Sequence, residues 1–129
     1  MRILLDTQCW LWLHAEPERF GAEALAAIED TRNRLFFSAA SAWEIAIKYA
    51  LGRLPLPVPP ADYVPSRMRV ADTAALPITL EHAFRVAELP PHHRDPFDRM
   101  LVAQGQVEGL RLITTDRKLA SYDVDVIWT

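Results

Sequence analysis

The stretch DPFDRMLVAQGQVEGLRLIT, residues 95–114, predicts a helix followed by a strand. Asp95 is typical of the residue that caps a helix N-terminus, and Pro96 suits the first helical position because its missing N–H needs no partner there. Gly109 stands where a C-terminal cap is expected, and the apolar run at 110–114 then predicts a buried strand. A helix that leads directly into a buried strand is typical of parallel sheets.

The same alternation of strands and helices extends over the whole sequence. The expected strands are 2–5, 35–37, 74–78, 110–114 and 124–128, and the expected helices begin near residues 7, 17, 38 or 41, 79, 95 and 116. Because five prolines fall within 55–65, we expect an extended surface connector there, with a helical turn or two at 63–70. The pattern predicts an α/β fold of three layers, α/β/α, around a mostly parallel sheet of about five strands, in a single domain spanning 1–129.

The composition fits one small globular domain and excludes several classes of protein. The chain has 129 residues, half of them apolar, and a formal net charge of −3. We find no apolar run of the roughly 18–20 residues that a membrane span needs, and no signal-peptide pattern. The single cysteine, Cys9, excludes an internal disulfide and a Cys-rich zinc site. We therefore expect a soluble, cytoplasmic protein. The aromatic residues expected in the core or at a dimer interface are Trp10, Trp12, Phe36, Phe37, Trp43 and Trp128.

Four acidic residues stand where expected strands end or helices begin. Asp6 ends the first strand, and Asp116 follows the fourth. Glu44 lies near the start of the helix after the second strand, and Asp98 lies in the first turn of the helix before the fourth strand. Because ligands of open parallel sheets bind beyond the carboxyl ends of the strands, we expect the four carboxylates to share one edge of the sheet.

Each of these residues also has a purely structural interpretation. Asp6 and Asp116 could cap the helices that follow them, and Asp98 could belong to a capping box. Glu44 could form a surface ion pair with Lys48, four residues later. Clustered carboxylates, however, repel one another unless a cation neutralises them, and an all-oxygen set suits Mg²⁺ or Mn²⁺. Such an ion can activate water for attack on a phosphodiester, so the convergence of the four predicts phosphate chemistry.

Four segments of the sequence carry a resemblance to a known family, namely LLDT at 4–7, SAWEIAIK at 41–48, DPFDRMLVAQ at 95–104 and LITTD at 112–116. In this order they resemble the PIN domain, and specifically the VapC-type toxins of toxin–antitoxin pairs, over essentially the whole chain. The resemblance implies a PIN-like fold and a Mg²⁺- or Mn²⁺-dependent ribonuclease that hydrolyses RNA. It also implies a homodimer and a cognate antitoxin protein, which we expect to cover or enter the acidic groove.

The resemblance implies a catalytic quartet of Asp6, Glu44, Asp98 and Asp116. Asp6 and Asp98 are implied as direct metal ligands. Glu44 and Asp116 are implied either as further ligands of the ion or as groups that act through water or orient the nucleophile.

The residues next to the quartet provide secondary candidates. Thr7 matches the Ser or Thr that the family carries beside its first Asp, and Thr115 precedes Asp116. Asp95 is mainly a helix cap with a secondary role at the site. Arg99 either holds a phosphate or pairs with Asp95. The loop histidines at 92–93 could bind metal or phosphate, although such pairs are more often exposed to solvent.

Two other functions stay open at this stage. One is a catalytically silent PIN scaffold that only binds a protein partner, which the intact quartet argues against. The other is a receiver-like, Mg²⁺-binding signalling domain, for which neither Lys48 nor Lys118 is well placed. The glycines form neither a P-loop nor a dinucleotide fingerprint, and no Gly-x-Ser-x-Gly elbow is present, so we do not expect ATP, NAD or serine-hydrolase chemistry.

Overall fold

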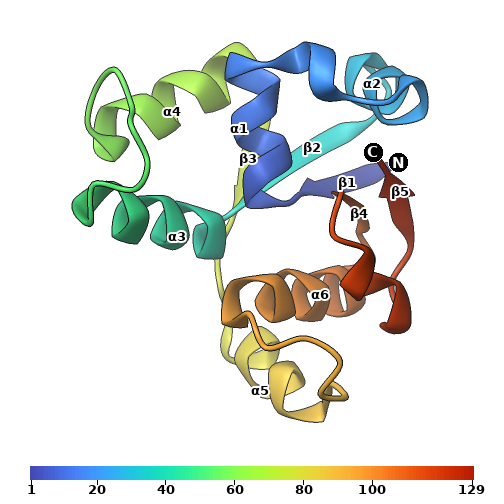
Figure 1. Ribbon diagram of the computed structural model, residues 1–129. Helices are drawn as coiled ribbons and strands as arrows, with labels where there is room; N and C mark the ends of the chain where they lie inside the picture. Colours follow the sequence, from blue (N-terminus) through green and yellow to red (C-terminus); the bar gives the residue numbers. More distant parts are fainter.

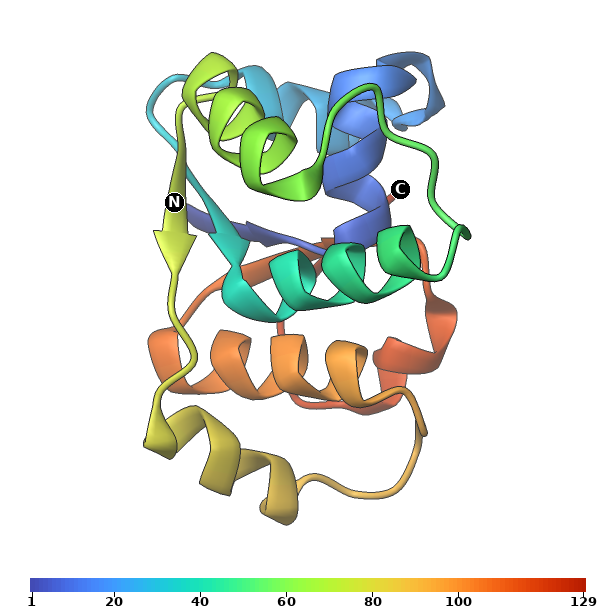
Figure 2. The same cartoon turned by 90° about the vertical axis from the view of Figure 1, so that its left-hand side faces the viewer.

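The computed structural model describes residues 1–129 and contains a five-stranded parallel sheet covered by helices on both faces (Figures 1 and 2). The strands are β1 (Arg2–Leu5), β2 (Arg34–Ser38), β3 (Thr73–Leu76), β4 (Arg111–Thr114) and β5 (Val126–Trp128). The α-helices are α1 (Thr7–Ala15), α2 (Ala22–Glu29), α3 (Ala39–Ala50), α4 (Pro60–Val70), α5 (Leu80–Glu88) and α6 (Pro96–Glu108), and the 3₁₀ helices are η1 (Pro17–Arg19) and η2 (Arg117–Ser121). The predicted three-layer α/β class is confirmed.

The order of the strands, β3-β2-β1-β4-β5, fixes where a ligand can bind. After β1 the chain adds β2 and β3 on one side, and it then returns to add β4 and β5 on the other. The order therefore reverses between β1 and β4, where Leu5 pairs with Ile113. The next residues along these strands, Asp6 and Thr114, consequently lie side by side at the carboxyl edge, which is the ligand-binding position of such sheets.

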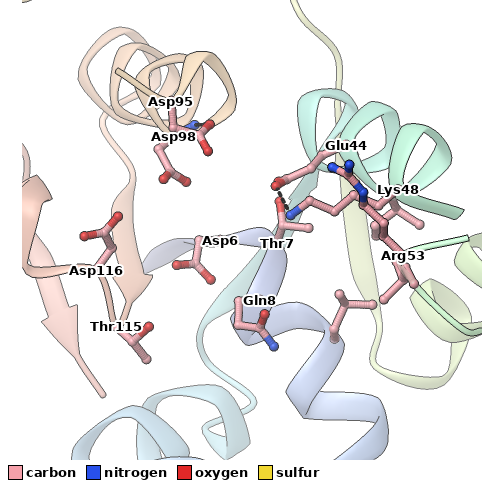
Figure 3. Close-up of a pocket in the computed structure, with 13 residues that line it drawn as sticks. Asp6, Thr7, Gln8, Glu44, Lys48, Arg53, Asp95, Asp98, Thr115 and Asp116 are labelled. Atoms are coloured by element: carbon pink, nitrogen blue, oxygen red, sulfur yellow. Dashed lines mark hydrogen bonds and ion pairs between the residues drawn. The ribbon is translucent and has the colours of Figure 1, made fainter. Parts of the chain in front are cut away.

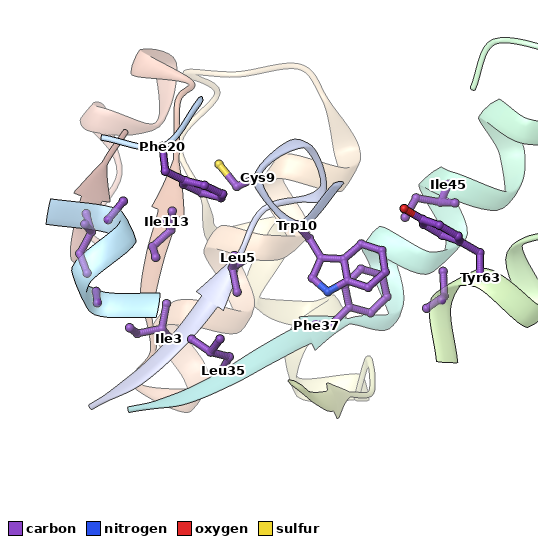
Figure 4. Close-up of a cluster of buried hydrophobic side chains, with 14 residues drawn as sticks. Ile3, Leu5, Cys9, Trp10, Phe20, Leu35, Phe37, Ile45, Tyr63 and Ile113 are labelled. Carbon is purple, nitrogen blue, oxygen red and sulfur yellow. The ribbon is translucent and has the colours of Figure 1, made fainter. Parts of the chain in front are cut away.

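The two faces of the sheet bury two hydrophobic cores. Ile3 and Leu5 of β1 join a core that includes Trp10 of α1 (Figure 4), whereas Leu4 joins a second core that includes Leu101 of α6. All three β1 side chains are fully buried. This is the expected state of a parallel strand covered on both faces, and it holds the end of β1 rigidly at the centre of the molecule.

The ends of α6 follow the sequence prediction. Asp95 Oδ1 accepts hydrogen bonds from the backbone N–H groups of Phe97 (2.8 Å) and Asp98 (3.1 Å), and Pro96 occupies the first helical position. Gly109 ends the helix in the left-handed conformation, with a φ of 66°. Asp95 therefore caps the N-terminus of α6 and Gly109 caps its C-terminus, as the sequence predicted.

The proline-rich segment differs from the prediction, because α4 begins at Pro60 and contains Pro65, whereas we expected an extended connector through residue 65. Pro60 is compatible with a helix since the first N–H groups have no intrahelical partner. Pro65 removes one internal hydrogen bond. Tyr63 and Val64 are buried in the same core as Trp10 of α1. Burial of a side chain such as valine stabilises the fold by about 1.5–3 kcal/mol, and this gain holds the segment helical.

Three further details refine the predicted elements. The helix expected near residue 17 is divided into η1 and α2. Of the two serines that could cap α3, Ser38 is the cap, and its Oγ accepts a hydrogen bond from the Ala40 N–H at 3.0 Å. Trp43 is 61% exposed, so it does not belong to the core.

None of the helices is both long and apolar enough to cross a membrane.

Gly109→Ala should lower the free energy of unfolding by about 1 kcal/mol, because a Cβ at a φ of 66° collides with its own backbone. Urea denaturation followed by circular dichroism measures this change. Gly109→Asn is the matched control and should lose less, since asparagine tolerates the left-handed conformation. Equal losses in the two variants would contradict the conformational explanation.

Candidate active site

A cavity of about 510 Å³ opens at the carboxyl edge of the sheet (Figure 3). Seven of the residues singled out in the sequence line it, namely Asp6, Thr7, Glu44, Asp95, Asp98, Thr115 and Asp116. They come from the β1–α1 junction, α3, the start of α6 and the segment after β4. The predicted convergence of the quartet on one edge of the sheet is therefore present in the structure.

Asp6 is the most deeply buried carboxylate of the quartet, with only 6% of the residue exposed. Its Oδ1 accepts a hydrogen bond from the Cys9 N–H (2.7 Å) and so caps α1, while its Oδ2 accepts one from the Thr114 hydroxyl (2.6 Å). Burial raises the pKa of Asp6 above its usual value and the charge of Glu44 adds to this, whereas the hydrogen bonds act in the opposite direction. Asp6 therefore caps α1 and also lines the cavity.

Asp98 faces the same space as Asp6 and Asp116 (Figure 3). Because Asp95 supplies the cap of α6, the carboxylate of Asp98 is left free to enter the cavity. Burial raises the pKa of Asp98 to about 6, and the charges of Asp95 and Asp6 contribute, against an opposing hydrogen bond from His93. The raised pKa therefore reflects mainly the withdrawal of this carboxylate from water, and no lysine or arginine forms an ion pair with it.

Glu44 and Thr7 connect the cavity to α3. The Glu44 carboxylate forms the ion pair with Lys48 that the sequence allowed, with an Oε2–Nζ distance of 2.7 Å, and Glu44 is only 7% exposed. The Thr7 hydroxyl donates a hydrogen bond to Ser41 Oγ at 2.9 Å. This bond ties α1 to α3, so the Thr7 oxygen is engaged in holding the two walls of the cavity together.

Asp116 caps η2 by accepting a hydrogen bond on Oδ1 from the Lys118 N–H at 3.0 Å. The Asp116 N–H donates to Thr114 Oγ1 at 3.0 Å, and the Thr114 hydroxyl in turn donates to Asp6. Thr114 therefore links two members of the quartet. Sequence analysis missed this role, because the threonine ends an apolar strand and no local signal distinguishes its hydroxyl from that of any buried threonine.

His93 is the second functional candidate that the sequence interpretation did not select. Its Nε2 lies 2.9 Å from Asp98 Oδ2 and 3.0 Å from Asp116 Oδ2. The side chain is only 10% exposed, so this residue of the expected solvent-exposed histidine pair is packed against the site. The neighbouring His92 is exposed and lies against Tyr122.

Arg99 lies outside the cavity lining, as do the loop histidines at 92–93. Its guanidinium donates hydrogen bonds to the backbone carbonyls of Pro90 (2.9 Å) and Val86 (3.0 Å) and to the Tyr122 hydroxyl (3.1 Å). Val86 belongs to α5, Pro90 to the segment between α5 and α6, and Tyr122 directly follows η2. Arg99 therefore fastens the loop that carries His93, and its guanidinium forms no ion pair with Asp95.

The donor set of the cavity suits a hard divalent cation. Asp6, Asp98 and Asp116 present carboxylate oxygens to one space, and no sulfur atom takes part (Figure 3). Burial first, and neighbouring negative charge second, raise the pKa values of Asp6 and Asp98, so a bound cation would stabilise their charged forms. Mg²⁺ and Mn²⁺ prefer such oxygen ligands, so the residues present fit the metal that the sequence analysis expects.

Fold and cavity together define an α/β domain with a carboxylate site at the point where strand order reverses. The family model for the PIN domain matches residues 3–125, and the chain belongs to this family. The resemblance inferred from the four sequence segments is thereby confirmed.

Individual relatives agree with this assignment. "Ribonuclease VapC22" from Mycobacterium tuberculosis is 32% identical over 121 residues, which cover 93% of this chain and 91% of that protein. "Ribonuclease VapC16" from the same organism is 50% identical over 74 residues, or 54% of this chain, so the match spans only half of the length of that relative. Among solved structures, VapBC2 from Rickettsia felis bound to a DNA fragment from its promoter has a TM-score of 0.69 and 11% identity, with coverage of 100% of this chain and 99% of that chain. This structural likeness shows the fold.

In metal-free buffer, Asp98→Asn should stabilise the protein near neutral pH. The pKa of this carboxyl group is about 6 in the folded state and 3.8 in the reference state, so the unfolded chain ionises first as pH rises. Its ionisation therefore costs folding free energy that accumulates between about pH 4 and pH 6 and is complete above that range. Removing the charge should recover about 3 kcal/mol at neutral pH and only a small part of that near pH 4.

Urea unfolding in EDTA at the two pH values measures the difference. Asp125→Asn, at an exposed aspartate, is the matched control and should change the stability little at either pH. A gain from Asp98→Asn that is the same at both pH values would show that the carboxyl group is not the origin of the effect.

Proposed function

We propose that this protein is a metal-dependent ribonuclease that acts as the toxin of a toxin–antitoxin pair. The observation that carries the proposal is that Asp6, Glu44, Asp98 and Asp116 line one cavity although they are widely separated in sequence. The name "ribonuclease" of both VapC relatives supports RNA as the substrate. The convergence of buried, mutually repelling carboxylates supports the need for a cation.

In this proposal Asp6 and Asp98 hold a Mg²⁺ or Mn²⁺ ion, and Asp116 and Glu44 are further ligands or orient water. When bound, the ion supplies an activated water and neutralises the charge of the scissile phosphate. The chain itself supplies a rigid frame for these groups. Thr114 and the Cys9 N–H fix the Asp6 carboxylate by two short hydrogen bonds, so that little reorganisation is needed on binding.

Two basic side chains of the cavity wall, Lys48 and Arg53, favour a polyanionic substrate. The net charge of the chain is −3, so attraction of RNA depends on such local groups. Lys48 pairs with Glu44 and is still about half exposed, at 51%. Both cations therefore remain available to phosphates that pass the rim of the acidic cavity.

The proposed partner that silences this activity is a cognate antitoxin. Solved structures with this fold include VapBC from Salmonella typhimurium bound to DNA and a toxin–antitoxin complex from Klebsiella pneumoniae, which supports such a partner. We expect the antitoxin to cover or enter the acidic cavity and to offer it an Arg or Lys side chain.

Purified protein should cleave single-stranded or structured RNA in the presence of Mg²⁺ or Mn²⁺ and should lose the activity in EDTA. Changes to residues around metal ligands cost about 10–100-fold, so loss of a ligand in Asp6→Asn should reduce the cleavage rate by roughly 100-fold or more. A fluorogenic RNA panel measures the rate, with Asp125→Asn as the active control. Cleavage by Asp6→Asn at the wild-type rate would refute the assigned role, and an inactive wild-type protein would favour the silent scaffold.

The proposed homodimer is supported by an apolar surface on α3, α5 and α6. Trp43 is 61% exposed and packs edge-on against Phe97 at 5.3 Å between ring centroids. These rings help to line an apolar groove of about 230 Å³ that also includes Ile78 and Met100. Exposed apolar surface of this kind is typical of protein interfaces.

Light scattering coupled to size exclusion should therefore give twice the 14.7 kDa mass of one chain. Trp43→Glu should shift the mass to that of a monomer, because it places a charge in the apolar interface. Val70→Glu, at a 72% exposed residue of α4, is the control and should leave the dimer intact. A wild-type monomer would contradict the homodimer, and a dimer that survives Trp43→Glu would contradict this interface.

A further inference from the structure

The loop between α5 and α6 brings one imidazole against two carboxylates of the site. His93 Nε2 is within 3.0 Å of an oxygen of both Asp98 and Asp116, which belong to different elements. One potential ligand atom from each of the three residues lies within 4.8 Å of the other two. The arrangement allows two interpretations, in which His93 is either a metal ligand or a hydrogen-bond donor to ligands.

The other ring nitrogen distinguishes these interpretations. The Arg94 N–H donates a hydrogen bond to His93 Nδ1 at 3.1 Å. Since Nδ1 accepts this bond, it carries a lone pair, and the hydrogen of the ring is on Nε2. An Nε2–H cannot bind a metal ion, but it can donate a hydrogen bond to Asp98 Oδ2, and Asp116 Oδ2 lies 3.0 Å from the same nitrogen. The hydrogen-bond pattern thus favours the donor role.

The backbone of the loop is held in place independently of the two carboxylates. The His93 N–H donates a hydrogen bond to the Tyr122 hydroxyl at 2.9 Å, and the Arg99 guanidinium contacts the same hydroxyl at 3.1 Å. Arg99 also binds the Pro90 carbonyl at 2.9 Å. The loop therefore delivers the imidazole to a fixed position, which is a requirement for a residue that orients others.

We propose that His93 is a positioning residue whose Nε2–H bridges Asp98 and Asp116 and orients both carboxylates for the divalent cation. This inference rests on the proposed function. Each carboxylate gives one oxygen, Oδ2, to the imidazole. The Oδ1 atom of Asp98 stays available to a cation, and that of Asp116 also accepts the Lys118 N–H.

Loss of this donor has a direct physical consequence. Asp98 and Asp116 would face each other, with Asp95 and Asp6 nearby. The Asp98 carboxylate would lose its hydrogen bond from His93, and the Asp116 carboxylate would keep only the bond from the Lys118 N–H. Groups that hydrogen-bond to metal ligands typically contribute about 10–100-fold to metal affinity. Weaker metal binding is therefore expected even where the fold is unchanged.

Calorimetric titration of Mn²⁺ into the full chain tests the inference without reference to activity. His93→Ala should weaken Mn²⁺ binding by about tenfold or more. His93→Gln keeps an N–H donor near the position of Nε2 and should stay within roughly threefold of wild type. A merely structural role of the ring would not be rescued by glutamine. His92→Ala, at the exposed neighbour, is the matched control and should bind as wild type does.

Each remaining outcome overturns the inference. Unchanged or tighter Mn²⁺ binding by His93→Ala would show that the imidazole does not orient the ligands, and RNA cleavage by the wild type would then leave the proposed function standing. If His93→Gln bound Mn²⁺ as weakly as His93→Ala, the imidazole ring would be required for another reason than its N–H donor. A wild-type protein that neither binds Mn²⁺ nor cleaves RNA would remove the proposed function together with this inference.

Discussion

The concentration of negative charge at the centre of the sheet is the constraint on which the surrounding structure depends. Asp6 is buried directly after β1, where withdrawal from water penalises its charged form. The sheet itself supplies the compensation, because parallel register places Thr114 beside Asp6 and the first turn of α1 presents the Cys9 N–H. Hydrogen bonds from the same elements that bury Asp6 therefore stabilise its charge.

The negative charge of the carboxylates is balanced differently on the two sides of the cavity. Glu44 has a lysine partner at 2.7 Å, so its charge is balanced within the chain. Asp98 and Asp116 share a single imidazole, and neither forms an ion pair with lysine or arginine. A cation that enters the cavity is consequently attracted most strongly to the side of β4 and α6, where the carboxylates have no lysine or arginine partner. Burial, with the charges of Asp95 and Asp6 added to it, raises the pKa of Asp98 to about 6, and the hydrogen bond from His93 offsets this only in part.

Strands, caps and carboxylates were predictable from sequence because their signals are local. Hydrophobic runs define the strands, and topology then carries Asp6 and Asp116 to one edge. Helical turns at 63–70 were predicted, but the start of α4 at Pro60 and its course through Pro65 were not. They depend on the burial of Tyr63 and Val64 by distant elements, against the local preference of proline. The position of His93 likewise depends on contacts of its loop with Arg99 and Tyr122, which no local pattern in the sequence reveals.

Structural and functional interpretations of these acids are compatible, since a carboxylate has two oxygens. Asp116 caps η2 through Oδ1 and meets His93 through Oδ2. Asp6 caps α1 through Oδ1 and binds Thr114 through Oδ2, and each oxygen retains a further lone pair. Capping fixes the rotamer of a side chain at a helix start, where the helix dipole also favours negative charge. The helix starts at the sheet edge thus preorganise the site, and Asp95 extends the principle by capping α6 so that Asp98 need not.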